Sequence, residues 1–178
     1  MRMLICYATT DGQTRKVAEY IADLVRMKGN EADIVDASVA DNVEPSQYQG
    51  VVLAGSVHMG RYQTPLIYQI RRWRDALNAM PTAFVSVSLS AASQDPHAHA
   101  EVDECAQHML KEAGLHPTVI LHVAGAIRFS QYDFFRRWLM RLVAKQMDRD
   151  IDPGADMEFT DWDALSASVD KFLALTRA

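Results

Sequence analysis

The sequence predicts an α/β fold: a doubly wound, five-stranded parallel sheet with helices on both faces. Five short apolar runs alternate with segments whose apolar residues recur at helical spacing, which is typical of parallel strands joined by right-handed crossovers. The run at 50–55 is apolar throughout and bounded by glycines, as expected for a strand covered on both faces. The run at 3–8 leads directly into a glycine-containing loop and a helix, which is how such folds begin.

The remaining elements are assigned from their end signals. Strands are expected at 3–8, 32–36, 50–55, 82–89 and 118–124. Helices are expected after the first loop as far as Gly29-Asn30, from Thr64-Pro65 to Met80-Pro81, from Asp95-Pro96 to Gly114, and from 160–163 onward. Thr or Asp as an N-cap, proline in the first turn and glycine after the last turn support these boundaries, with Thr64 as the N-cap of the second helix.

Length and composition limit the functional classes. The 178 residues suffice for one domain, 1–178, that buries about two thirds of its unfolded surface. A net charge of -5 argues against general nucleic-acid binding. Cys6 and Cys105 suggest no disulfide framework, which fits a reducing, cytoplasmic setting. We see neither a secretion signal nor an apolar run of the ~20 residues that span a bilayer, so we expect a protein that is neither secreted nor integral.

The loop at 9–14 is the strongest functional signal. Backbone N–H groups and the positive end of a helix dipole converge there, and Thr9, Thr10 and Thr14 add hydroxyl donors. The P-loop pattern and the Gly-x-Gly-x-x-Gly fingerprint are both missing. We therefore predict a phosphate-binding loop without lysine, the alternative being an ordinary turn before a helix. Asp11 would repel a phosphate, so we expect its side chain to turn away and cap or brace the loop.

This loop resembles the first loop of flavodoxin-like proteins, which reads Ser/Thr-x-Thr-Gly-x-Thr and surrounds the FMN phosphate. A closer resemblance is to the menaquinone-dependent protoporphyrinogen IX dehydrogenases, short flavodoxin-type enzymes of bacterial haem synthesis that carry Thr-x-Asp-Gly-Gln-Thr-Arg. Further similar segments occur in order at 55–62, 86–89, 124–128 and 132–133. The resemblance therefore covers nearly the whole chain.

The resemblance implies the strand order 2-1-3-4-5 and FMN as cofactor. Ligands of such sheets lie beyond the carboxyl ends of the strands, so the loops at 9–14, 56–63 and 88–96 should form one site. The residues expected to contact the cofactor are Thr9, Thr10, Asp11, Gly12, Gln13, Thr14, Ser56, Val57, His58, Met59, Gly60, Tyr62, Ser86, Val87, Ser88, Leu89, Ser90 and Gly125. The rings of His58 and Tyr62 could lie against the isoalloxazine, or the loop could simply carry them outward.

The implied activity is oxidation of protoporphyrinogen IX to protoporphyrin IX, with a membrane quinone, menaquinone or ubiquinone, as the electron acceptor. Because a flavin supplies the redox chemistry, we assign no catalytic acid or base. Two alternatives stay open: a flavodoxin-like electron carrier without a substrate of its own, and an NAD(P)H:quinone reductase of the same fold. Propionates of a tetrapyrrole could pair with arginines, which could equally be surface charges. The candidates are Arg61, Arg128, Arg136 and Arg137.

We expect residues 126–158 to form a helical insertion after the fifth strand, which a minimal domain of this kind does not need. At about 100° per residue, an apolar face and a basic face separate near 133–147. The apolar face carries Phe135, Trp138, Leu139, Leu142 and Val143, and the basic face carries Arg137, Arg141 and Lys145. This helix either packs on the domain or docks peripherally on the anionic inner face of the cytoplasmic membrane.

Four other residues bear on metal binding: His97, His99, Cys105 and His108. His97 and His99 would diverge on a helix, and no Cys-x-x-Cys or His-Glu-x-x-His pattern completes a ligand set. We therefore expect exposed histidines and no metal site. A Gly-x-Ser-x-Gly elbow is also missing, so the sequence gives hydrolysis no support.

Overall fold

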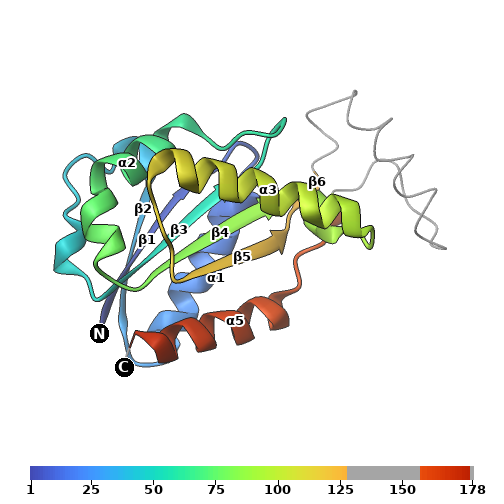
Figure 1. The fold of residues 1–178 in the computed structure, drawn as a ribbon. Helices are drawn as coiled ribbons and strands as arrows, with labels where there is room; N and C mark the ends of the chain where they lie inside the picture. The colour runs from blue at the N-terminus through green and yellow to red at the C-terminus, as the bar shows by residue number, and fades with distance from the viewer. Residues whose placement is uncertain (128–156, 177–178) are drawn as a thin grey trace.

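The protein is described here by a computed structural model covering residues 1–127 and 157–176. Its five-stranded parallel sheet has the order β2-β1-β3-β4-β5 and is covered by helices (Figure 1). The strands are β1 (Arg2–Ala8), β2 (Glu31–Asp36), β3 (Gly50–Ser56), β4 (Thr82–Ser88) and β5 (Val119–Ala124). The predicted fold class and strand order are confirmed.

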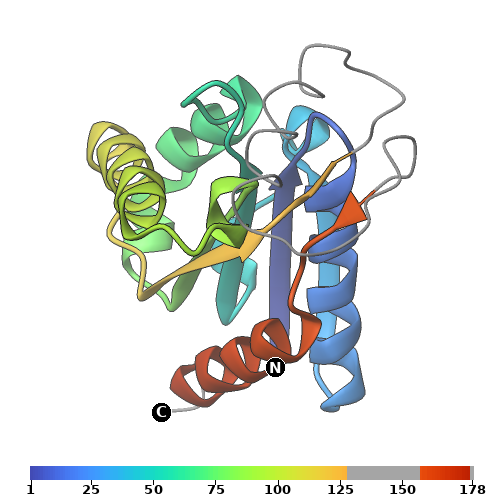
Figure 2. The same cartoon turned by 90° about the vertical axis from the view of Figure 1, so that its right-hand side faces the viewer.

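Four α-helices cover the two faces of this sheet in the described part of the chain. They are α1 (Gln13–Met27), α2 (Thr64–Asn78), α3 (Pro96–Ala113) and α5 (Trp162–Leu175). Helices α1 and α5 lie on one face, and α2 and α3 lie on the other (Figure 2). Short 3₁₀ helices also lie in the connections, namely η1 (Ala37–Val39), η2 (Pro45–Gln47) and η3 (Ser90–Ala92).

The core consists of two apolar layers, one on each side of the sheet. Alternate side chains of β1 supply both, because successive residues of a strand point to opposite faces. Met3, Ile5 and Tyr7 join the layer beneath α1 and α5, while Leu4 and Cys6 join the layer beneath α2 and α3. This two-sided burial explains why the strands read as continuous apolar runs.

The helix ends follow the predicted signals with one correction. Asp95 accepts a hydrogen bond from the N–H of His97 at 3.0 Å, and Asp161 accepts one from Ala164 at 2.9 Å. Gly114 closes α3 in the left-handed region with φ of 71°. Thr64, however, is the first residue of α2 rather than its N-cap; Gln63 holds the cap position with extended backbone.

The insertion is described only at its base. There β6 (Ala126–Ile127) pairs antiparallel with β7 (Met157–Glu158). The predicted amphipathic helix near 133–147, and with it Arg128, lies outside the described residues. Within the part that is described, no helix is both long enough and apolar enough to cross a bilayer.

Candidate functional site

The loops after β1, β3 and β4 begin side by side at one edge of the sheet. The strands are adjacent, with Ala8 beside Gly55 and Ser56 beside Val87. The amide of Gln63 joins the first two loops, because its Nε2 donates to Thr10 Oγ1 at 3.1 Å and to Ser56 Oγ at 2.6 Å. The structure thus brings the three predicted loops together.

The loop at 9–14 ends in a helix terminus whose donors are open. Gly12 is the N-cap of α1, with φ of 87°, and its N–H donates to Thr9 Oγ1 at 2.9 Å. The first intrahelical bond runs from Lys16 N–H to Gly12 O. In the described residues no side chain caps this end, so the N–H groups of residues 13–15 have no internal acceptor. Such a terminus favours an anion.

A buried hydroxyl in the same turn also has no partner. Thr14 is 1% exposed, and its Oγ1 makes no hydrogen bond within the described part of the chain. An unsatisfied buried polar group costs about 1–3 kcal/mol. A ligand oxygen at the helix terminus would give this hydroxyl its partner, so the loop fits a phosphate.

Asp11 differs from the expectation that it braces the loop. Its Oδ1 is buried and has no hydrogen-bond partner among the described residues. Thr9 takes the bracing role instead, because its Oγ1 accepts the Gly12 N–H. A carboxylate oxygen only accepts hydrogen bonds, so a hydroxyl donor suits it better than a phosphate oxygen does.

The loop after β3 is a tight hairpin. His58 and Arg61 exchange backbone hydrogen bonds of 2.9 and 3.1 Å. Met59 and Gly60 at the tip have φ of 51° and 73°, as a type I′ turn requires. Met59 is 89% exposed, and a non-glycine residue in the left-handed region is strained, which is a feature of ligand sites.

The tip of this hairpin is tied to α3. The Sγ of Cys105 donates to the carbonyl of Gly60 at 3.4 Å. Burial raises the pKa of the Cys105 thiol, which keeps the proton that this bond uses. The hairpin therefore has support from outside its own turn.

Tyr62 lies in the core beneath the hairpin. Its hydroxyl is 2.8 Å from Ser86 Oγ, and its ring meets Phe84 edge-on with centroids 5.3 Å apart. The residue is only 5% exposed, and burial raises the pKa of its phenol far above the usual range. This position gives no support to stacking of Tyr62 on a flavin. The packing here also explains Gly55, whose added Cβ would lie 2.6 Å from Leu66 Cδ2 and 3.1 Å from Tyr62 Cδ1.

The loop after β4 is joined to the neighbouring loops mainly by backbone hydrogen bonds. The Val57 N–H donates to Val87 O, and the Gly125 N–H donates to Ser88 O, each at 2.9 Å. Ser88 Oγ accepts the N–H of Ala91 at 3.1 Å and so starts η3. The side chains of Ser86 and Val87 are buried, while Leu89 and Ser90 are partly exposed. Only the later residues of this loop can offer side chains to a ligand.

Two residues that connect the loops, Gln63 and Thr160, were not among the residues expected to contact the cofactor. Thr160 Oγ1 accepts from Gln13 Nε2 at 3.0 Å and donates to Ala124 O at 2.7 Å. These bonds join residues that are 147 and 36 positions apart, so no local motif marks them. For Gln63, its place between the hairpin and the Pro-containing helix start was the available signal.

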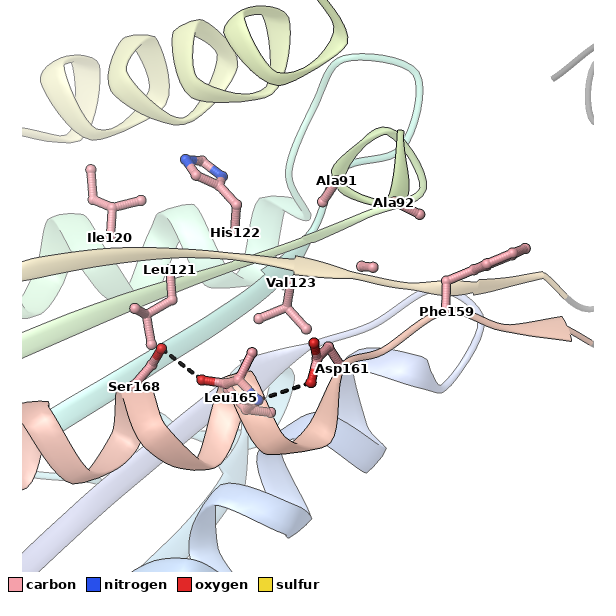
Figure 3. Close-up of a pocket in the computed structure, with 12 residues that line it drawn as sticks. Ala91, Ala92, Ile120, Leu121, His122, Val123, Phe159, Asp161, Leu165 and Ser168 are labelled. Atoms are coloured by element: carbon pink, nitrogen blue, oxygen red, sulfur yellow. Dashed lines mark hydrogen bonds between the residues drawn. The ribbon is translucent and has the colours of Figure 1, made fainter. Parts of the chain in front are cut away.

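A separate hollow of about 390 Å³ lies along the outer edge of β5 (Figure 3). It is lined by η3, β5, Phe159 and the first turns of α5. Leu121 and Val123 point toward α5 (Figure 3), while His122 bonds Asp103 on the other side. Asp161 and Ser168 use their side chains within α5. In the described residues, no three His, Cys, Asp or Glu side chains gather as a metal site there or elsewhere.

Residues 4–153 match a family model described as a flavodoxin domain. The chain belongs to this family. Among solved structures, oxidised flavodoxin 1 of Bacillus cereus superposes with a TM-score of 0.57 at 18% identity, covering 98% of both chains. The flavodoxin of Streptococcus pneumoniae TIGR4 gives a TM-score of 0.58 at 15% identity, over 98% of this chain and 99% of that one. The fold is thus that of flavodoxins, which implies flavin binding.

Sequence relatives resemble the chain over nearly its whole length. Protoporphyrinogen IX dehydrogenase (quinone) of Escherichia coli K12 is 28% identical over 166 residues, 93% of this chain and 91% of the relative. The enzyme of the same name from Leishmania major is 29% identical over 181 residues, 99% of this chain and 77% of the relative. The chain is therefore homologous to quinone-dependent protoporphyrinogen IX dehydrogenases, as the loop motif indicated.

Proposed function

We propose that the protein is an FMN enzyme of haem biosynthesis that oxidises protoporphyrinogen IX to protoporphyrin IX and reduces a quinone, menaquinone or ubiquinone. The observation that carries the proposal is the near full-length similarity to enzymes named for this reaction. The open helix terminus at residues 12–15 supports it, because that terminus suits the phosphate of FMN.

The chain's own groups have separable tasks in this proposal. The N–H groups of residues 13–15 and Thr14 Oγ1 would hold the phosphate, while Asp11 Oδ1 would accept from a hydroxyl of the ribityl chain. The hairpin at 58–61 and the loop at 88–92 would flank the ring. When bound, FMN supplies the redox chemistry, accepting electrons from the porphyrinogen and passing them to the quinone.

We also propose peripheral attachment to the inner face of the cytoplasmic membrane, where a lipophilic quinone is found. The support is the sequence of the predicted helix near 133–147, whose cations could each contribute about 1 kcal/mol at an anionic surface. Those residues lie outside the described part of the structure. Vesicle co-sedimentation of the wild type against Arg137→Glu/Arg141→Glu/Lys145→Glu tests this, and equal binding of the two proteins would contradict it.

The activity itself is tested by anaerobic turnover of protoporphyrinogen IX with and without a menaquinone analogue. We expect porphyrin fluorescence to appear only when the purified flavoprotein and the quinone are both present, and the flavin released on denaturation to be FMN by mass. An unchanged rate of porphyrin formation in the presence of protein would contradict the proposal. Electron transfer to a protein acceptor without such turnover would favour the flavodoxin-like carrier, whose fold the chain shares.

A further inference from the structure

The chain segment that returns from the insertion lies directly against the first two turns of α1. On α1 the contacting residues follow the spacing i, i+3 and i+7, which places them on one helix face. On the returning segment they are alternate residues. We call this set the clamp; it consists of Gln13, Lys16 and Tyr20 with Glu158, Thr160 and Trp162.

The end of the clamp nearest the phosphate loop is a hydrogen-bond chain through one hydroxyl. Gln13 Nε2 donates to Thr160 Oγ1, and that hydroxyl donates to the carbonyl of Ala124 at the end of β5. Gln13 is buried and is the first residue of α1. Its backbone N–H is one of the open donors of the helix terminus, so the bond to Thr160 holds the residue that carries that donor.

The other end of the clamp is held by charge and by ring contacts. Glu158 accepts from Lys16 Nζ at 2.5 Å and from Trp162 Nε1 at 2.7 Å. Partial burial opposes ionisation of Glu158, but these hydrogen bonds outweigh it and lower the pKa of the carboxyl. Lys16 Nζ lies 5.2 Å from the centroid of the Trp162 ring, and the ring centroids of Trp162 and Tyr20 are 4.7 Å apart.

The returning segment also contacts the opposite side of the site. The Phe159 N–H donates to Gly125 O at 3.0 Å, and the Gly125 N–H donates to Ser88 O. The returning segment therefore links Gln13 of the phosphate loop to Ser88, where the loop after β4 begins, through Thr160, Phe159 and Gly125, which belong to neither loop. Gly125 and Phe159 lie at the base of the insertion: Gly125 directly precedes β6 and Phe159 directly follows β7, which pair with each other.

We propose that the clamp holds the first turn of α1 in the geometry that receives a phosphate, so that Thr160 and Glu158 are positioning residues that favour FMN over riboflavin. This rests on the proposed function, because it takes FMN as the cofactor. A terminus with open donors gains little from its own hydrogen bonds and frays easily. A ligand that must order the turn binds more weakly than one that finds it ordered. Riboflavin has no phosphate and gains little from an ordered turn.

The test is the ratio of dissociation constants of the apoprotein for riboflavin and FMN, measured by quenching of flavin fluorescence. Thr160→Val keeps the shape of the side chain and removes both of its hydrogen bonds, whereas Thr160→Ser keeps the hydroxyl. We expect Thr160→Val to weaken FMN binding about tenfold, or about 1.4 kcal/mol, and to change riboflavin binding less than about twofold. Thr160→Ser should restore the wild-type ratio.

Two further variants complete the design. Glu158→Gln keeps an acceptor for Trp162 but removes the charge that Lys16 meets, so it should lower the ratio by about threefold. Glu158 is exposed, so Glu158→Gln carries the test if Thr160→Val does not fold, as judged by thermal melting of the apoprotein. Ser168→Ala, two turns into α5, is the matched control and should leave the ratio unchanged.

The outcomes separate this inference from the cofactor assignment. A wild type that binds riboflavin as tightly as FMN overturns both. A wild type that prefers FMN, with clamp variants that keep the preference or weaken both flavins equally, overturns the positioning role alone. Selective loss of FMN affinity with rescue by Thr160→Ser supports it.

Discussion

The two loops that meet at Gln63 satisfy their polar groups in opposite ways. In the hairpin at 58–61, His58 and Arg61 pair with each other and Cys105 donates to the tip. In the loop at 9–14, the helix donors find no acceptor among residues 1–127 and 157–176, and Thr14 Oγ1 is buried without a partner in that part of the chain. The loops are neighbours at the same edge of one sheet, so this contrast is not a consequence of their position in the fold.

The contrast indicates which loop depends on a ligand. The backbone of the hairpin is strained at Met59, but the hairpin is held by hydrogen bonds within the protein and needs no ligand to keep its shape. The phosphate loop carries the cost of unpaired polar groups, which a bound ligand would remove. FMN binding should therefore change the second loop far more than the first, and variants of the two loops should fail in different ways.

The largest expected effect is that of Gly12→Val. A β-branched residue at φ of 87° is strained and would block backbone approach to a phosphate, so we expect at least about a hundredfold loss of FMN affinity. Gly29→Val is the matched control, since Gly29 follows the C-cap of α1 with φ of 76°, and among the described residues no atom lies within 4 Å of its added Cβ. That variant should lose stability and still bind FMN. A Gly12→Val protein that folds with full FMN occupancy would defeat the assignment of the loop.

Thr14→Val should give the next largest effect. It removes a buried hydroxyl that has no partner in the described part of the chain, so FMN should bind about tenfold more weakly, while the apoprotein should be as stable as the wild type or up to about 1 kcal/mol more stable. Flavin titration and urea unfolding of the apoprotein measure the two quantities. Destabilisation of the apoprotein with unchanged FMN affinity would mean that Thr14 serves the fold alone.

Tyr62→Phe should affect stability and leave the choice of flavin unchanged. It leaves the buried Ser86 hydroxyl without the bond at 2.8 Å, which costs about 1–2 kcal/mol. The measurement is urea unfolding together with the ratio of riboflavin to FMN affinity. A change in that ratio would show that the Tyr62 hydroxyl acts on the cofactor, contrary to its place in the core.

Gly60→Ala should have the smallest effect. Its φ of 73° disfavours alanine, but no atom of the described residues lies within 4 Å of an added Cβ, so the loss of stability should be about 1 kcal/mol. Thermal unfolding measures this cost, and FMN affinity should fall by less than about threefold. A loss as large as that of Gly12→Val would show that the hairpin, too, needs its backbone open for the ligand.

The fold was predictable because its signals are local. Apolar runs marked the five strands, and Asp95, Gly114 and Asp161 marked helix ends by chemistry that acts within one turn. The N-cap of α2 was predicted one residue too late, at Thr64. Gln63 takes the cap position, and its side chain bridges two loops. Strand order needed the family resemblance, since parallel pairing leaves no local mark.

The site was predictable as a set of loops but not as a set of contacts. Tyr62 lies in the loop that the motif marks, yet which way its ring points is decided by packing on Phe84. Thr160 is far from every motif in the sequence and reaches Gln13 only through the fold. Asp11 was expected to brace the loop, but the shorter hydroxyl side chain of Thr9 meets the Gly12 N–H instead.

We expect the phosphate of FMN to complete the first turn of α1. Amide hydrogen exchange of residues 13–15 tests this claim, in the apoprotein and with saturating FMN or riboflavin. We expect fast exchange in the apoprotein, at least about tenfold slowing with FMN and little change with riboflavin, while the paired amides of His58 and Arg61 are slow throughout. Slow exchange at residues 13–15 without flavin, or equal protection by riboflavin, would contradict the claim.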